Sequence, residues 1–98
     1  MTINKEANGT DLTIAIEGRL DTITSPELEE EVKAIPEDVT KLTFDLKDLE
    51  YISSAGLRVL LAAQKIMNKQ GEMTVTGVTE AIMEIFDVTG FADILTIA

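Results

Sequence analysis

Apolar residues in this 98-residue chain change their spacing along the sequence, and that change is the strongest constraint on the fold. In segments 12–17 and 42–47 apolar residues alternate with polar or small ones, which predicts half-buried strands. Segment 54–69 has helical spacing instead, which predicts a long, deeply packed helix. The apolar positions that define this helix are Val59, Ala62, Ala63, Ile66 and Met67.

Turn and cap signals divide the rest of the chain. Asn8-Gly9 predicts a type I′ hairpin turn, with the segment from Thr2 to Ala7 as the antiparallel partner of the first clear strand. Ser25-Pro26 predicts a helix start, with the serine as cap, and Pro36 predicts its end. The remaining elements we expect are a strand at 73–76, a helix from Thr79 to Gly90, closure of the long helix at Gln70-Gly71, and a short strand at 94–97.

The expected element order is β-β-α-β-α-β-α-β over residues 1–98, one domain without a linker or repeat. Strands separated by helices predict right-handed crossovers. The fold class is therefore α/β, with a mixed, mainly parallel sheet, an N-terminal hairpin and about three helices packed on it.

Composition excludes several functions. The 18 acidic and 8 basic residues give a net charge of −10, which argues against direct binding to nucleic acid or anionic lipid. Without His or Cys there is no imidazole base, thiolate nucleophile or common transition-metal ligand, which leaves only carboxylate sites for Mg²⁺ or Ca²⁺ open. We expect neither a cofactor nor a metal. No membrane span or signal peptide is expected either, so a soluble cytoplasmic protein is the default.

The segment from Tyr51 to Arg58 is the unusual one, because two serines and a glycine open the most apolar helix. A phosphoryl group on Ser54 would lie near free backbone N–H groups and the positive end of the helix dipole. The lack of a side chain at Gly56 would let another backbone approach closely. The simpler interpretation is that Ser53 or Ser54 only caps the helix.

Charge is uneven along the chain. Segment 51–71 holds three basic residues and no acidic one, whereas the remainder holds 18 acidic and 5 basic residues, net −13. Helical spacing predicts an exposed row of Ser54, Arg58, Lys65 and Lys69. This row is either a solvated helix face or a docking strip for an acidic partner, with Ser54 at its end.

Serine catalysis does not fit this segment. Ser-Ser-Ala-Gly is not a nucleophile elbow, and no His can deprotonate the hydroxyl. A Ser-Lys pair would have to reach Lys65, three turns along the helix. The chain also lacks a P-loop motif, so we expect no enzyme activity and no catalytic residue.

Three motifs in order resemble the STAS domain of bacterial anti-sigma factor antagonists, over nearly the whole chain. They are Gly18-Arg19-Leu20-Asp21 followed by Leu28, the run from Leu46 to Leu57, and Phe86-Asp87-Val88-Thr89-Gly90-Phe91.

This resemblance implies a phosphorylation switch. The unphosphorylated antagonist would bind an anti-sigma factor with serine kinase activity and free the sigma factor, and a PP2C-type phosphatase would restore it. The phosphorylated serine corresponds to Ser54, preceded here by Ser53 where the best-known members have Asp. The implied partner-binding residues are Asp21, Thr22, Ser53, Ser54, Ala55, Gly56 and Arg58.

A second function shares this fold: a STAS subunit of a transport or signalling assembly that binds partners without being phosphorylated. In either case the partners would be proteins. We expect a monomer or a weak dimer, because an exposed sheet edge would favour self-association.

Overall fold

The computed structural model describes all 98 residues, and its central element is a mixed five-stranded sheet. β1 (Thr2–Asn8) and β2 (Asp11–Leu20) form an antiparallel hairpin. β3 (Lys41–Asp45) and β5 (Glu72–Thr76) continue the sheet in parallel, in the order β1-β2-β3-β5. The predicted α/β class and mixed, mainly parallel sheet are confirmed.

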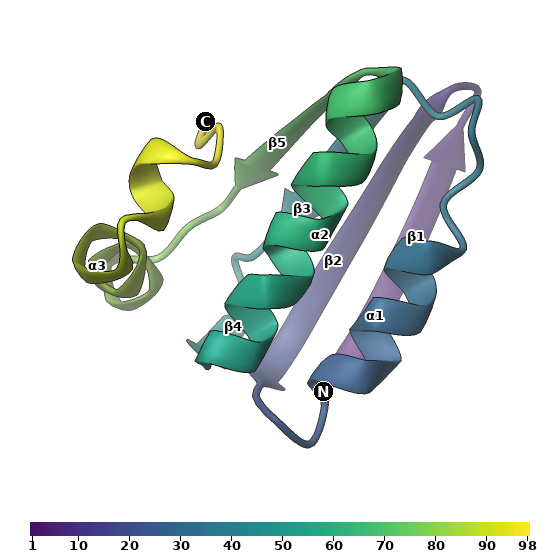
Figure 1. Ribbon diagram of the computed structural model, residues 1–98. Helices are drawn as coiled ribbons and strands as arrows, with labels where there is room; N and C mark the ends of the chain where they lie inside the picture. Colours follow the sequence, from purple (N-terminus) through teal and green to yellow (C-terminus); the bar gives the residue numbers. More distant parts are fainter.

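The helices lie against this sheet. α1 (Ser25–Lys33) and α2 (Ser54–Gln70) run side by side across one face of it, as Figure 1 shows. α3 (Glu80–Thr89) packs beside β4 (Leu49–Ile52) and is followed by a single 3₁₀ turn at Phe91–Asp93. The prediction of three helices is confirmed, and none combines the length and the apolar character that a membrane crossing requires.

The N-terminal hairpin differs from its prediction by one position. Asn8 pairs with Asp11, so the two-residue loop is Gly9-Thr10 and not Asn8-Gly9. Gly9 has a φ of 64°, and no residue other than glycine has a positive φ. A positive φ at the first loop position alone fits a type II′ turn rather than the predicted type I′ turn.

Two strand predictions need correction. β4 was not expected, because its four residues show no clean alternation: Leu49 and Ile52 are buried, and Glu50 and Tyr51 are exposed. The strand expected at 94–97 is reduced to one bridge between Val75 and Ile97, because the chain first winds into the 3₁₀ turn.

Two details of the ends of α1 also differ. α1 ends at Lys33 rather than at Pro36, and Ser25 lies inside the helix, where its hydroxyl donates to the carbonyl oxygen of Asp21 rather than capping N–H groups. Gly71 does end α2, but its φ of 174° is ordinary extended backbone. Glycine is needed because a Cβ there would lie 1.9 Å from the carbonyl oxygen of Thr40.

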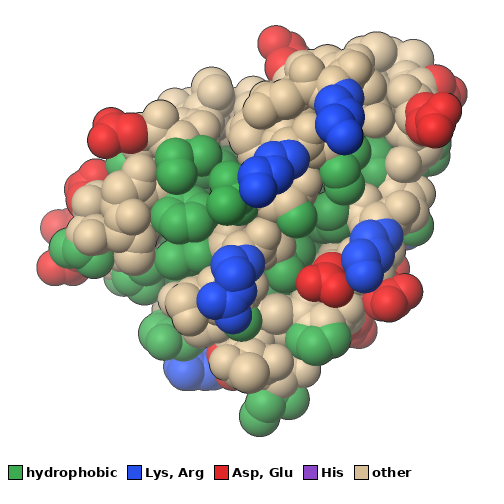
Figure 2. All heavy atoms as spheres, viewed as in Figure 1, with side chains coloured by type: hydrophobic (Ala, Val, Ile, Leu, Met, Phe, Trp, Pro, Cys, Tyr) green, Lys and Arg blue, Asp and Glu red, His purple; other side chains and the backbone are tan.

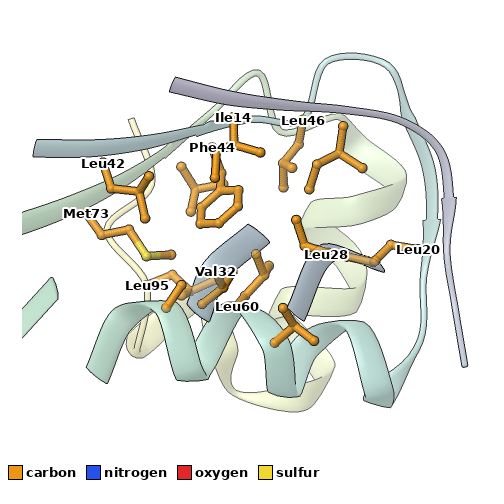
Figure 3. Packing of buried hydrophobic residues seen from close by; sticks show 14 of the residues in the cluster. Ile14, Leu20, Leu28, Val32, Leu42, Phe44, Leu46, Leu60, Met73 and Leu95 are labelled. Atoms are coloured by element: carbon orange, nitrogen blue, oxygen red, sulfur yellow. The ribbon is translucent and has the colours of Figure 1, made fainter. Parts of the chain in front are cut away.

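The core lies between the sheet and the helices. Figure 3 shows Phe44, Leu42 and Met73 from the strands pointing toward Leu60 on α2 and Val32 on α1. The 23 buried core residues form one cluster, built almost wholly from aliphatic side chains. Burial of this apolar face stabilises α2 more than helix propensity alone could. Ala62 is the exception to its predicted face, because it is exposed.

Candidate protein-interaction site at the start of the long helix

The two adjacent serines at the start of α2 have different environments. Ser53 is the N-cap, and its hydroxyl oxygen accepts a 3.4 Å hydrogen bond from the backbone N–H of Gly56. Ser54 is the first helical residue; it is exposed, and its hydroxyl makes no hydrogen bond within the chain. The cap interpretation therefore holds for Ser53 alone, and Ser54 presents a free hydroxyl at the positive end of the helix dipole.

The ends of β2 and β4 fix this site in place. The two strands pair in parallel, with Leu20 beside Ile52, and the backbone N–H of Ser53 donates to the carbonyl oxygen of Leu20 at 2.9 Å. Parallel strands end at the same edge of a sheet. The chain segments that follow, the turn at 21–24 and the start of α2, are therefore neighbours, as the predicted docking surface requires.

The turn at 21–24 is ordered by Asp21. One carboxylate oxygen, Oδ1, accepts the backbone N–H of Ile23 at 3.0 Å and that of Thr24 at 3.1 Å. The other, Oδ2, lies 3.8 Å from Nε of Arg19. These interactions, led by the hydrogen bond from the Thr24 backbone, hold the pKa of Asp21 below its ordinary value of 3.8, although partial desolvation opposes them. Thr22, in the same turn, is exposed.

Gly56 is more deeply buried than the two serines before it. Gly56 is buried, and a Cβ there would lie 2.7 Å from Cγ of Leu20 and 2.9 Å from Cγ1 of Ile52. Because Gly56 has no side chain, the core side chains of Leu20 and Ile52 can pack against it. The prediction was instead that another backbone approaches this glycine. Ala55 is half-buried. Among the predicted partner-binding residues, Gly56 therefore supports the surface from beneath.

The predicted row of Ser54, Arg58, Lys65 and Lys69 is exposed along α2, and these three basic residues with Ser54 are called the α2 strip below. None of the three cations forms an ion pair within the chain, whereas Lys5, Arg19, Lys33 and Lys47 each do. Figure 2 shows this face, with blue side chains following α2 and red ones to either side.

Sequence reasoning missed two side chains near the site. The guanidinium of Arg19 lies 4.4 Å from the ring centre of Tyr51, a cation–π contact between neighbouring residues of β2 and β4. Arg19 lies in a motif that the sequence displays, but the contact depends on β4, which the sequence does not predict. Ile23, at the tip of the turn, is the most exposed large apolar residue of the chain.

The arrangement favours docking of another protein over small-molecule chemistry. None of the surface hollows is lined by Ser53, Ser54 or the turn at 21–24. No group of three or more acidic, His or Cys side chains is placed to hold a metal ion. What the site does offer is a free hydroxyl, a rigid turn and a row of unpaired cations on an open surface.

A mixed sheet with an N-terminal hairpin and three helices packed on it defines a small α/β domain. The family model of the STAS domain matches residues 2–98, and the chain belongs to this family. It is 31% identical over 97 residues to the anti-sigma-B factor antagonist of Bacillus subtilis (strain 168), covering 98% of this chain and 89% of the relative.

Solved structures share the fold. An anti-sigma factor antagonist from Mycobacterium paratuberculosis superposes with a TM-score of 0.84 at 24% identity, covering 98% of this chain and 83% of that one. The Bacillus cell fate determinant SpoIIAA in its phosphorylated form gives a TM-score of 0.77 at 15% identity, covering 99% and 91%.

Proposed function

We propose that this chain is an anti-sigma factor antagonist controlled by phosphorylation of Ser54. In its unphosphorylated form it binds an anti-sigma factor that is also a serine kinase, and the sigma factor is released. The identity to the Bacillus subtilis antagonist supports the class of function. The observation that carries the switch is the contrast between the engaged hydroxyl of Ser53 and the free, exposed hydroxyl of Ser54.

The chain acts as the acceptor in this reaction. The kinase transfers the terminal phosphoryl group of ATP to the Ser54 oxygen, with ADP as the leaving group. It also supplies the base that takes the hydroxyl proton, because no side chain of this chain is hydrogen-bonded to the Ser54 hydroxyl. A PP2C-type phosphatase removes the group again. Both enzymes act in the cytoplasm, and the antagonist affects transcription by capturing a protein, without contacting nucleic acid.

A phosphate on Ser54 is tolerated within the domain. It adds a charge of about −1.5 to −2 at neutral pH, close to the helix N-terminus and to Arg58, one turn further along α2. No acidic residue occupies the first turn of α2, so the phosphate meets no repulsion there. Across a close interface the same group adds bulk and must lose its hydration. The complex therefore dissociates through a local clash while the fold stays unchanged.

The α2 strip gives the partner a second area of contact. Its three cations have no partner within a chain that is otherwise strongly acidic, so an acidic segment of the anti-sigma factor can pair with them. Arg58 serves both states: it faces the partner before phosphorylation and can pair with the phosphate afterwards. The antagonist works as a monomer or a weak dimer.

Phosphate mapping tests this function. The chain is incubated with ATP and each purified anti-sigma factor kinase of its host, and mass spectrometry locates the modification. We expect phosphate on Ser54, none on the Ser54→Ala variant, and release of the partner from the modified form. Phosphate on Ser53 would overturn the assignment. A partner found to be a membrane transporter component, with no phosphorylation by any kinase, would instead favour the interaction-module function.

A further inference from the structure

One large apolar side chain stands out beside the proposed phosphorylation site. Ile23 is 88% exposed, more than any other large apolar residue of the chain. Single apolar residues on a surface are common and need no explanation by themselves. Ile23 differs in two respects. Its backbone is held in place, and it lies at the carboxyl ends of the strands, where the acceptor serine also lies.

The fixation is a network around the turn at 21–24. Asp21 accepts the backbone N–H groups of Ile23 and Thr24, and the Thr24 hydroxyl donates to the carbonyl oxygen of Arg19 at 2.9 Å. The backbone N–H of Asp21 in turn donates to the Thr24 hydroxyl at 2.9 Å. Little conformational freedom remains for the turn to lose when a partner binds.

The position of the turn follows from the strands. Leu20, the last residue of β2, is hydrogen-bonded to Ser53, so Ile23 and Ser54 extend from two chain segments that are joined at their bases. A protein that approaches the Ser54 hydroxyl closely enough to phosphorylate it therefore meets this turn as well.

We propose that Ile23 is the apolar anchor of the complex and that Asp21 is the residue that positions it. The partner is the anti-sigma factor kinase of the proposed function, on which this inference rests, and its matching feature is an apolar pocket beside its phosphoryl-transfer site. A few buried anchors usually supply most of the binding energy of an interface. The carboxylate of Asp21 is turned into its own loop, so its contribution to binding is indirect.

Affinity measurements with matched variants test the anchor. The probe is the purified host kinase that phosphorylates Ser54. The Ile23→Ala variant is expected to bind about 30-fold more weakly, because loss of an anchor costs on the order of 2 kcal/mol. Val88→Ala is the control: Val88 is 79% exposed and lies on α3, which Figure 1 shows well away from this turn. It should bind like the unmodified chain.

Two substitutions at Asp21 separate positioning from direct contact. Asn keeps an oxygen that can accept both backbone N–H groups, whereas Ala does not. Asp21→Asn should therefore retain most of the affinity and Asp21→Ala should lose it to about the same extent as Ile23→Ala. If Asn and Ala were equally damaging, the carboxylate charge would be the contact and the positioning role would be wrong.

The outcomes also distinguish a failure of this inference from a failure of the proposed function on which it rests. If wild type and Ile23→Ala bind the kinase equally, the anchor is wrong while the antagonist function stands. If no host kinase binds or phosphorylates the chain, the antagonist function fails and the anchor fails with it. Circular dichroism of each variant checks that the fold is retained. Ile23→Ala should leave the spectrum unchanged, because the Ile23 side chain is exposed.

Discussion

The backbone N–H of Ser53 donates a 2.9 Å hydrogen bond to the carbonyl oxygen of Leu20, and this bond joins the two halves of the candidate site. Leu20 leads into the turn at 21–24, and Ser53 leads into α2. Because the bond sits below both segments, a group added to the exposed Ser54 hydroxyl need not disturb it. The switch can therefore work through the surface while the framework stays rigid.

Replacing Ser54 with Asp should weaken partner binding strongly without destabilising the domain. A negative charge at the first helical position interacts favourably with the helix dipole, so the free energy of unfolding should stay equal or rise by about 0.5 kcal/mol. Urea unfolding and far-ultraviolet circular dichroism measure this, and affinity for the kinase is measured in parallel. Ser54→Ala should keep its affinity. A large loss of folded signal in Ser54→Asp would refute the local clash.

Replacing Ser53 with Ala should cost stability but not the modification. The variant loses the N-cap hydrogen bond to Gly56, which is worth about 0.5–1 kcal/mol. The melting temperature should fall by roughly 3–6 °C for a domain of this size. Ser53→Asn preserves a cap acceptor and is the matched control. An unchanged melting temperature together with lost phosphorylation would mean that Ser53, and not Ser54, is the acceptor.

Gly56→Ala tests how closely α2 approaches the sheet. Alanine favours a helix by up to about 1 kcal/mol, but its Cβ would lie 2.7 Å from Cγ of the fully buried Leu20. Overpacking of this kind costs about 1–3 kcal/mol, so a net loss of stability is expected. In the Leu20→Ala background the penalty should shrink but not vanish, because Cγ1 of Ile52 still lies 2.9 Å from the added Cβ, and a double-mutant cycle of unfolding free energies would show this. Additive effects would contradict the contact.

Much of the fold follows from the sequence, because its strongest signals coincide with its buried faces. The alternation at 12–17 and the helical spacing at 54–69 correspond to β2 and α2, whose apolar residues face the core. The failures arise where a pattern is too short to show a period. β4 has four residues, and the segment after the 3₁₀ turn makes only one bridge.

The site was predictable in outline for the same reason. A serine pair before a long helix predicts a cap, but only the geometry shows that Ser53 is the cap and Ser54 is free. The inward direction of the Asp21 carboxylate depends on hydrogen bonds to backbone groups, which no residue pattern displays. Gly56 was assigned to the surface because a glycine in a sequence does not show whether backbone or side chains lie opposite it.

The depressed pKa of Asp21 predicts a contribution to stability that depends on pH. The hydrogen bonds from the Thr24 and Ile23 backbone favour the ionised carboxylate in the folded state. Stability from this group is therefore fully present above the ordinary pKa of 3.8 and is lost as the pH falls through the lower folded value. The stability difference between wild type and Asp21→Asn should shrink over that interval. Carboxyl chemical shifts followed by NMR give the pKa of Asp21 in the folded state. A pKa at or above 3.8 would contradict the hydrogen bonds assigned to this carboxylate in the turn.

Reversing the charge of the α2 strip should slow association with the anti-sigma factor. The double variant Lys65→Glu/Lys69→Glu replaces two exposed, unpaired cations, so attraction of an acidic segment becomes repulsion. We expect an association rate about 10-fold lower at low salt and a weaker dependence on salt concentration, measured by surface plasmon resonance.

Single charge reversals, which change the net charge equally, distinguish the strip from the net charge of the whole molecule. Lys41 is also exposed and without an ion pair, and it lies outside α2, at the start of β3; it is close to the C-terminal end of α2 but far along the sheet from the carboxyl ends of β2 and β4. Lys47→Glu is less suitable, because Lys47 is paired with Asp45. Lys41→Glu should change the association rate only slightly. If Lys65→Glu alone were no slower than Lys41→Glu, the cations of α2 would be an ordinary solvated helix face, and the partner would bind through the turn and Ser54 only.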